Sequence, residues 1–283
     1  MDTPEKREAP IRVHFGAGFH AAAGRPVDAA AYYQYIGRWS QLFVPAVLAA
    51  AEVAGGDRVL DIATGPGEAA LGALSVVKPA GLVIGADISP AMLTAARARL
   101  GDEAFRPVAM DGQALAFREG SFDAVVCQLG LQFFPNPAQG LAEFRRVLRV
   151  GRCTAVCVIS TPARAPMWGV LADTLSHHLP DQRETFHLGF ALADPERFAH
   201  LFRAAGFRDV QVKRERRQGA IESFEDYWAP IEAGTGQIPQ AYLALPESSR
   251  RAVREEVRAR LAEFESGGRL EMSVEMLIGA GRA

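Results

Sequence analysis

The sequence predicts an α/β fold, a doubly wound sheet of mostly parallel strands with helices on both faces. Short apolar runs alternate with helical segments between residues 58 and 160. These runs are almost continuously apolar, which is typical of parallel strands that are covered on both sides. The first run ends in a glycine turn, Gly65-Pro66-Gly67, from which a helix begins. With 283 residues, of which 49% are hydrophobic, the chain can bury a substantial core.

The expected elements are seven strands of one sheet, with helices between them along the chain. A helical region precedes the first strand, with Asp28 as its N-cap and Gly55-Gly56 as its stop. Asp194 and Pro195 mark the start of a later amphipathic helix. The last strand alternates between polar and apolar residues, and it is expected to lie antiparallel beside the sixth strand. Strands are expected at 58–63, 81–88, 105–110, 121–128, 153–160, 208–215 and 269–282, and helices at 28–54, from the glycine turn to 77, and at 89–100, 137–149, 194–206, 222–231 and 246–265.

Two parts of the chain depart from this alternation. Residues 1–54 are expected to form an N-terminal arm and helices that act as a lid, and the core spans 55–283. Within the core, 161–193 is a helical insertion after the fifth strand, rich in aromatic residues and histidine. Because this insertion follows the carboxyl end of a strand, it is expected to lie over the edge of the sheet where ligands bind in such folds.

Composition argues against several classes of protein. A formal net charge of −2 and a pI near 6.3 show no basic excess, so nucleic acid is not an expected partner. No apolar run approaches the roughly 18 residues of a membrane span, and the charged N-terminus lacks the apolar core of a signal peptide. A cytoplasmic protein is therefore expected. Cys127, Cys153 and Cys157 are expected to be buried packing residues, with no metal site.

The stretch RRAVREEVRARLAEFE, residues 250–265, mixes charges at helical spacing. It is interpreted as a solvated helix with one buried stripe. An oligomer or partner surface is the alternative, which leaves a homodimer open.

The carboxylates near the glycine turn distinguish between possible ligands. The turn 63–67, which begins with Ala63, fits nicotinamide and flavin sites as well as other nucleotide sites, and Asp87, which ends the second strand, can bind an adenosine ribose in all of them. Asp61, however, lies four positions before Gly65, where a carboxylate would repel a pyrophosphate at the following helix N-terminus. Asp111 follows the third strand and can accept a hydrogen bond from an adenine amine. A nucleoside that carries an ammonium and a sulfonium therefore fits better than a dinucleotide.

At this point the chain resembles the class I S-adenosylmethionine-dependent methyltransferases, which have a Rossmann-like fold. The resemblance is strongest to the small-molecule branch that includes ubiquinone and menaquinone methyltransferases. The matching segments run in the family's order from 59 to 152, over more than half of the family's core domain. They are VLDIATGPGEAA, VIGADISPAML, MDGQALAFREGSFDAVVCQLGLQFFPNP and LAEFRRVLRVGR.

The resemblance implies roles for individual residues at an S-adenosylmethionine site. Asp87 is expected to bind the ribose hydroxyls, and Asp61 to order the turn and receive the amino group through the backbone or water. A structural role for Asp61, as a cap or a tie for the turn, is the alternative. The remaining expected cofactor residues are Ala63, Gly65, Gly67, Gln128 and Leu129 at the methionine end, and Ile88, Met92, Asp111, Gly112 and Gln113 around the adenine.

Two positions depart from the family's pattern. The PGG turn after the helix that follows the fourth strand reads Val150-Gly151-Arg152, which changes a surface turn. A position that often holds histidine is Gln132, which puts a histidine base at that point in doubt.

The acceptor is expected to be a hydrophobic small molecule, such as a quinone, a polyketide or another natural product, with the aromatic insertion 161–193 forming its pocket. Methylation at oxygen, nitrogen or carbon is open, and a base is needed only for a hydroxyl or an acidic carbon. His14, His187 and Tyr35 are the candidate catalytic residues, each with a structural role as the alternative. Two alternative functions remain: a cyclisation or rearrangement that keeps the cofactor, and a nicotinamide oxidoreductase.

Overall fold

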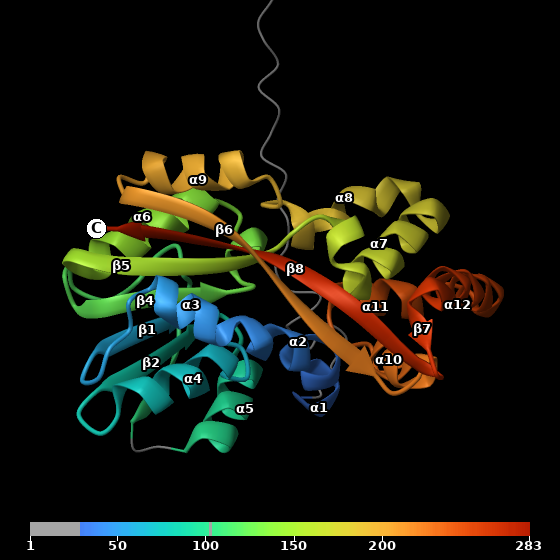
Figure 1. Cartoon of the computed structure of the whole chain (residues 1–283), viewed down its shortest axis with the longest axis horizontal. Coiled ribbons are helices and arrows are strands. Elements are labelled where there is room, and N and C mark those ends of the chain that lie inside the picture. Colours follow the sequence, from blue (N-terminus) through green and yellow to red (C-terminus); the bar gives the residue numbers. More distant parts are fainter. Residues whose placement is uncertain (1–28, 102–103) are drawn as a thin grey trace, which may run out of the picture.

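The computed structural model describes residues 29–101 and 104–283, so that His14, Asp28 and the expected arm lie outside the described residues. A mixed sheet with the strand order β3-β2-β1-β4-β5-β8-β6 forms its centre (Figure 1). The strands are β1 (Arg58–Ile62), β2 (Leu82–Asp87), β3 (Phe105–Ala109), β4 (Phe122–Gln128), β5 (Leu148–Ile159), β6 (Arg208–Ile221), the short β7 (Glu265–Ser266) and β8 (Arg269–Arg282).

The sheet confirms the expected doubly wound fold with an antiparallel last strand. The pairs β1–β2, β2–β3, β1–β4 and β4–β5 are parallel, and β8 is antiparallel to both β5 and β6. The expected position of the last strand is confirmed, because β8 lies antiparallel beside β6, and it also pairs with β5 on its other side. The strand order reverses between β1 and β4, which is where such sheets bind ligands.

Helices cover both faces of the sheet, as the continuous apolar runs predict. On one face lie α3 (Val44–Ala50), α4 (Glu68–Val77) and α5 (Pro90–Leu100), and on the other α6 (Pro137–Val147) and α9 (Pro195–Ala204) (Figure 1). Val59 packs with the first group and its neighbour Leu60 with the second, since successive strand side chains point to opposite faces. The two apolar clusters together form the core.

Local signals explain where the helices begin. The Ser89, Asn136 and Asp194 side chains accept hydrogen bonds from the backbone three residues on, and each is followed by proline at the first helical position. Such caps satisfy amide groups that a helix start otherwise leaves without a partner. The expected start at Asp194 is confirmed.

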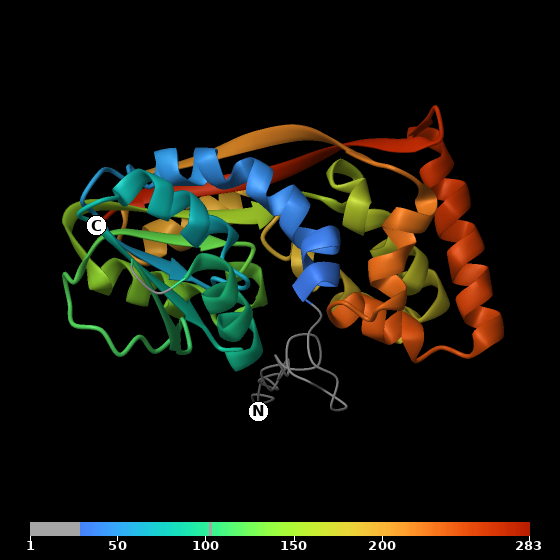
Figure 2. The ribbon, with the colours of Figure 1, turned by 90° about the horizontal axis from the view of Figure 1, so that it is seen from below.

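β8 has its expected bounds, whereas β6 continues past its expected end at 215 to Ile221, and the β6–β8 pair leaves the sheet. Its register continues to Ile221 opposite Leu270, whereas β5 pairs with β8 only as far as Met276. This ribbon carries α10 (Phe224–Glu232), α11 (Gln237–Leu243) and α12 (Glu247–Leu261), against which α7 (Pro166–His178) and α8 (Arg183–His187) gather (Figure 2). We call these five helices the helical lobe. The insertion 161–193 is therefore only part of a larger unit.

The charged helix α12 has the expected buried stripe, formed by Val253, Val257 and Leu261. It is not simply solvated on its other side. Glu256 and Arg260 face α7, and Arg260 donates hydrogen bonds to the Thr174 hydroxyl and the Val170 carbonyl.

Glu275 ties the ribbon to the sheet at the point where β8 leaves β5. Its carboxylate is buried and accepts hydrogen bonds from the Ser160 hydroxyl at 2.9 Å and from Arg164 at 2.9 Å. Arg214 and Arg216 of β6 approach it at 3.4 Å. These contacts fix the direction in which the lobe projects.

The three cysteines are free and buried, which confirms their expected role in packing. Across residues 29–101 and 104–283 no group of histidine, cysteine and acidic side chains is arranged to hold a metal ion. The helices within those same ranges include none long and apolar enough to cross a membrane.

Candidate active site

A cavity of about 300 Å³ lies at the carboxyl ends of β1, β2, β3 and β4, beside the point where the strand order reverses. All the expected cofactor residues line it except Asp61 and Gly67. The lining residues are Tyr32, Ile62, Ala63, Gly65, Asp87, Ile88, Met92, Met110, Asp111, Gly112, Gln113, Gln128, Leu129, Gly130, Phe133, Phe134 and Pro135.

Asp87 joins two segments of the cavity wall. Its Oδ2 accepts a hydrogen bond from the Gly65 amide at 2.8 Å, and its Oδ1 accepts one from the Ser89 amide at 2.8 Å. Burial raises the pKa of this carboxyl, and the hydrogen bonds to Ser89 and Gly65 lower it again in part. A carboxylate oxygen can accept more than one hydrogen bond, so Asp87 keeps capacity for a ligand hydroxyl.

Asp111 and Gln113 form a second polar wall. Asp111 accepts hydrogen bonds from the backbone amide of Gln113 at 2.9 Å and from its side chain at 3.2 Å. The Gln113 side-chain oxygen accepts from the Asn136 amide at 2.8 Å, which links the wall to the start of α6. The second Asp111 oxygen remains at the cavity with one long contact of 3.4 Å to Gln113.

Two residues other than glycine have an unusual backbone conformation at the cavity. Ala63 follows β1 with a φ of 55°, and Leu129 follows β4 with a φ of 56°. Residues other than glycine seldom adopt this left-handed region, and such strain concentrates at functional sites. Gly67 has a φ of 90° and precedes α4, and a Cβ there would lie 2.5 Å from Leu100. Gly67 thus shapes the turn and does not line the cavity.

Asp61 lies behind the glycine turn in a smaller chamber that also contacts Thr64, Glu68 and Gln128. Its Oδ2 accepts a hydrogen bond from the Thr64 hydroxyl at 2.6 Å, and its Oδ1 is buried without a partner among the described residues. Burial raises the pKa of Asp61 to about 7, and the Thr64 hydrogen bond opposes that rise. The unpaired oxygen is available to a donor or a cation.

Three carboxylates surround the turn. Asp61 and Asp87 flank it, and Glu68 begins α4 and pairs with Arg99 at 2.8 Å. A helix start would favour an anion, but carboxylates at this density oppose a pyrophosphate. Ile88 and Met92 add apolar surface beside them. These residues fit a nucleoside that carries positive charge, as S-adenosylmethionine does.

The N-terminal helical run borders this end of the cavity, which Tyr32 lines. Figure 2 shows the run between the sheet and the helical lobe. The run comprises α1 (Ala29–Tyr32), a π turn (Tyr33–Gly37) and α2 (Arg38–Ser40). Tyr32, Ile36 and Ser40 recur every four residues and contact the chamber at the turn. The Gln128 side chain donates a hydrogen bond to the Ser40 carbonyl at 2.5 Å, which ties the run to the end of β4.

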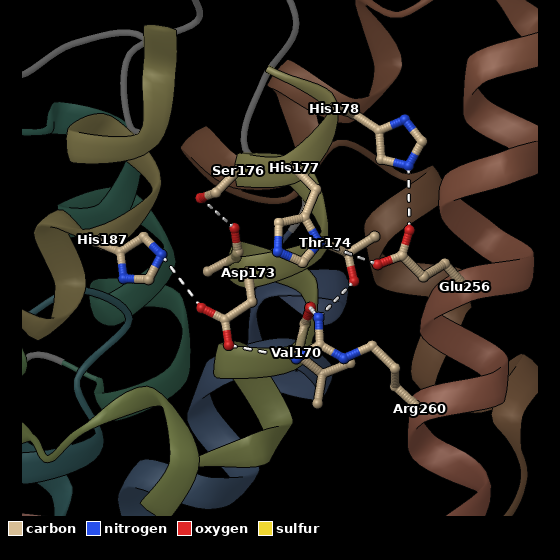
Figure 3. Close-up of polar contacts among 10 residues, drawn as sticks. Val170, Asp173, Thr174, Ser176, His177, His178, His187, Glu256 and Arg260 are labelled. Carbon is tan, nitrogen blue, oxygen red and sulfur yellow. Dashed lines mark hydrogen bonds and ion pairs between the residues drawn. The ribbon is translucent and has the colours of Figure 1, made fainter. Parts of the chain in front are cut away.

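Two of the candidate catalytic residues, Tyr35 and His187, lie within the described residues, and neither lines the cavity. Tyr35 is buried, and its backbone carbonyl accepts a hydrogen bond from the Trp168 indole at 3.1 Å. His187 ends α8, with its Nε2 3.3 Å from Oδ1 of Asp173, an ion-pair distance without the angles of a hydrogen bond (Figure 3). The following turn, Leu188–Phe190, packs against Leu131–Phe133, which borders the cavity.

Histidines also link two helices of the lobe. His177 and His178 on α7 both approach Glu256 of α12, at 3.4 Å and 3.3 Å, and Asp173 approaches Arg260 at 3.3 Å (Figure 3). His177 and His178 therefore connect α7 to α12 and do not contact the cavity.

Sequence reasoning missed several wall residues. Tyr32 is not among the expected cofactor residues, although its four-residue spacing with Ile36 and Ser40 could have placed it on the cofactor side. Met110 precedes Asp111 directly, and its position at the end of a strand was the available signal. Phe133 and Phe134 belong to a matching segment, but nothing in the sequence distinguishes wall from core there.

Comparisons with known proteins agree with this geometry. Residues 60–154 match a family model described as a methyltransferase domain. The demethylmenaquinone methyltransferase of Deinococcus radiodurans is 34% identical over 164 residues, which cover 53% of this chain and 68% of the relative.

Solved structures share the fold. Phosphoethanolamine N-methyltransferase 2 of Haemonchus contortus, in complex with S-adenosyl-L-methionine, matches with a TM-score of 0.56 and 17% identity over 89% of this chain and 56% of that one. The [4+2]-cyclase SpnF matches with a TM-score of 0.52 and 17% identity over 86% of this chain and 81% of that one. At such identities the likeness shows a common fold alone.

A doubly wound sheet with a cavity at its switch point defines this chain as an α/β protein of the class that binds ligands at the carboxyl ends of its strands. The chain belongs to the class I S-adenosylmethionine-dependent methyltransferases and resembles the enzymes of quinone biosynthesis. As a member of this family, the chain uses S-adenosylmethionine as its cofactor. The expected family, fold and cofactor are confirmed.

Proposed function

We propose that the enzyme transfers the methyl group to a hydrophobic small molecule, of quinone or natural-product type, that binds between the cofactor cavity and the helical lobe. The observation that carries this proposal is the lobe's aromatic interior beside the carboxyl edge of the sheet. Trp168, Phe186, Phe190 and Trp228 are buried there in one apolar cluster with Ile159 of β5. The names of the quinone methyltransferase relatives support the same class of acceptor.

We assign the cofactor contacts as follows. Asp87 holds the ribose hydroxyls, Asp111 and Gln113 frame the adenine, and Asp61 receives the amino group. When bound, S-adenosylmethionine supplies an electrophilic methyl group. The chain contributes alignment and exclusion of water, which can account for much of the acceleration of an in-line displacement.

Methyl-deuterated S-adenosylmethionine, incubated with the enzyme and a pool of host metabolites, tests the reaction by mass spectrometry. We expect a labelled hydrophobic product that disappears with the Asp87→Ala variant. A new unlabelled isomer that forms only with cofactor present would instead show a cyclisation or rearrangement, for which the fold is equally suited.

We assign the base to His187 for acceptors that must lose a proton. Oδ1 of Asp173 lies 3.3 Å from the imidazole Nε2, and Arg260 contacts the other Asp173 oxygen at 3.3 Å. The ring also contacts Phe190, with centroids 5.9 Å apart.

His187→Ala is expected to lower kcat by about a hundredfold or more, the usual effect of removing a general base, and to leave cofactor affinity unchanged. Steady-state kinetics on the labelled product and calorimetry with S-adenosylhomocysteine measure the two effects. His200→Ala, an exposed histidine on α9, is the matched control. Equal kcat in the His187 and His200 variants would remove the base assignment and leave methyl transfer itself in place.

A further inference from the structure

Two tyrosine hydroxyls lie buried without a partner where the N-terminal helical run meets the lobe. Tyr35 belongs to the π turn and is 4% exposed, and Tyr227 belongs to α10 and is 0% exposed. Neither hydroxyl makes a hydrogen bond with the described residues. The π turn and α10 pack together, and burial followed by the field of Tyr35 raises the pKa of Tyr227. The two tyrosines therefore lie on packed elements, at the place where the run meets the lobe.

An unpaired buried hydroxyl is costly and uncommon. Buried tyrosines usually find a partner for the hydroxyl, and phenylalanine would fill the same space without the cost. The lobe itself provides the contrast. Tyr242 is 2% exposed, and its hydroxyl donates to Glu232 Oε1 at 2.9 Å. Packing alone therefore does not account for tyrosine at both 35 and 227.

The position of the pair connects it to the cofactor site. The same helical run places Tyr32 and Ile36 at the chamber beside the glycine turn and carries Tyr35 where the π turn packs on α10. A group held by Tyr35 is therefore one helix diameter or less from the cofactor wall.

The surroundings define what the pair can bind. The Tyr227 ring lies 6.0 Å from Phe224 and 6.4 Å from Trp228 between centroids, in an aromatic environment. Burial raises the pKa of Tyr227 well above its usual value, so the phenol keeps its proton and can donate it in a hydrogen bond. A pair of donors among aromatic rings suits an oxygen substituent on an apolar ring.

We propose that the Tyr35 and Tyr227 hydroxyls bind a carbonyl or hydroxyl oxygen of the acceptor, and so select oxygenated aromatic molecules over hydrocarbons of the same shape. This proposal rests on the proposed function, because it places the acceptor at the lobe. A site built to bind an oxygen rejects an analogue that lacks it, since its own buried groups then stay unpaired.

Stability gives the first test. Tyr35→Phe and Tyr227→Phe are expected to leave Tm unchanged or higher, because each removes a hydroxyl that has no partner. Tyr242→Phe is the matched control and is expected to lower Tm by about 2–4 °C through loss of its bond to Glu232. A drop in the Tyr35 and Tyr227 variants equal to that of the control would show that their hydroxyls are already bound within the protein, and would overturn the proposal.

Ligand selectivity gives the second test. 1-Naphthol and naphthalene differ by one hydroxyl, and their affinities are measured by equilibrium dialysis with saturating S-adenosylhomocysteine. We expect the wild-type protein and Tyr242→Phe to bind 1-naphthol about tenfold more tightly than naphthalene, and the Tyr35→Phe/Tyr227→Phe double variant to show no preference. No preference in the wild type, or an intact preference in the double variant, would contradict the assignment.

This readout is independent of methyl transfer. An enzyme that rearranges its substrate without labelling it would still show the preference, so failure of the proposed reaction leaves the binding result standing. A labelled product together with an unchanged preference in the double variant would keep the reaction and place the acceptor's oxygen elsewhere.

Discussion

Asp87→Ala is expected to weaken binding of S-adenosylhomocysteine by about a hundredfold. The substitution removes the carboxylate that we assign to the ribose, and each charge-assisted hydrogen bond is worth about 1.5–3 kcal/mol. It also frees the Gly65 amide, which donates to Asp87 at 2.8 Å, so the turn loses part of its support. Titration calorimetry of both proteins measures the change.

Asp123→Ala is a suitable control for this experiment. Asp123 also accepts a backbone hydrogen bond, from the Arg58 amide at 2.9 Å, and pairs with Arg149, but it lies near the amino ends of the strands. Its loss is expected to affect stability and to leave cofactor affinity within about twofold, because it is remote from the cavity. Equal affinities for wild type and Asp87→Ala would mean that the ribose is bound by other groups.

The cofactor wall could be predicted because its residues follow directly from strand ends. Asp87, Asp111 and Gln128 each end or follow a strand of the parallel part, and parallel strands bring their carboxyl ends to one edge of the sheet. Their separation along the chain is therefore converted into proximity by the topology alone. The pattern of continuously apolar strands separated by helices predicts this parallel arrangement.

The lobe could not be predicted in the same way, because it depends on pairing between distant segments. The outer half of β6 reads RRQGAI, with no clear alternation, and it becomes a strand through its register with β8 about fifty residues later. The contact of α7 with α12 likewise joins two insertions that the sequence shows separately. Which side of the N-terminal helical run faces the cofactor also depends on this docking.

The surroundings of individual side chains could not be predicted from the sequence either. The residue type at 187 suggested a base, but its partner Asp173 lies on another helix of the insertion and becomes apparent only when α7 and α8 pack together. Tyr35 was a candidate for catalysis, whereas the structure buries it where the π turn packs on α10, with its backbone carbonyl bonded to the Trp168 indole. Its unpaired hydroxyl is a property of the folded chain that no spacing could reveal.

Cofactor affinity is expected to rise by on the order of tenfold between pH 5.5 and 7.5. Asp61 has a pKa of about 7 because it is buried, so below that pH it is largely neutral and offers no charge to the ligand's ammonium. Binding of the ligand's ammonium favours the ionised carboxylate of Asp61 and releases its proton. The release of this proton costs more free energy at lower pH. Above about pH 8 the ligand's amino group itself loses its charge, and the affinity should fall again.

The same titration affects the free protein in the opposite direction. The pKa of Asp61 is near 3.8 when unfolded and about 7 when folded, so between these values the unfolded chain binds fewer protons. Its contribution to folding stability is therefore complete below pH 4 and is lost as pH rises to about 7. Asp61→Asn, which is nearly isosteric and does not titrate, should lack this decline.

Calorimetry with S-adenosylhomocysteine at pH 5.5, 6.5, 7.5 and 8.5, paired with thermal unfolding at the same values, separates the two effects. Wild type should gain affinity toward neutral pH while losing stability, and Asp61→Asn should bind weakly with little variation below pH 7.5. A wild-type affinity that stays flat while its stability declines would show that Asp61 titrates as described but that backbone carbonyls hold the ammonium. In that case Asp61 serves the turn through Thr64, and the charge of the ligand is met by the other carboxylates around it.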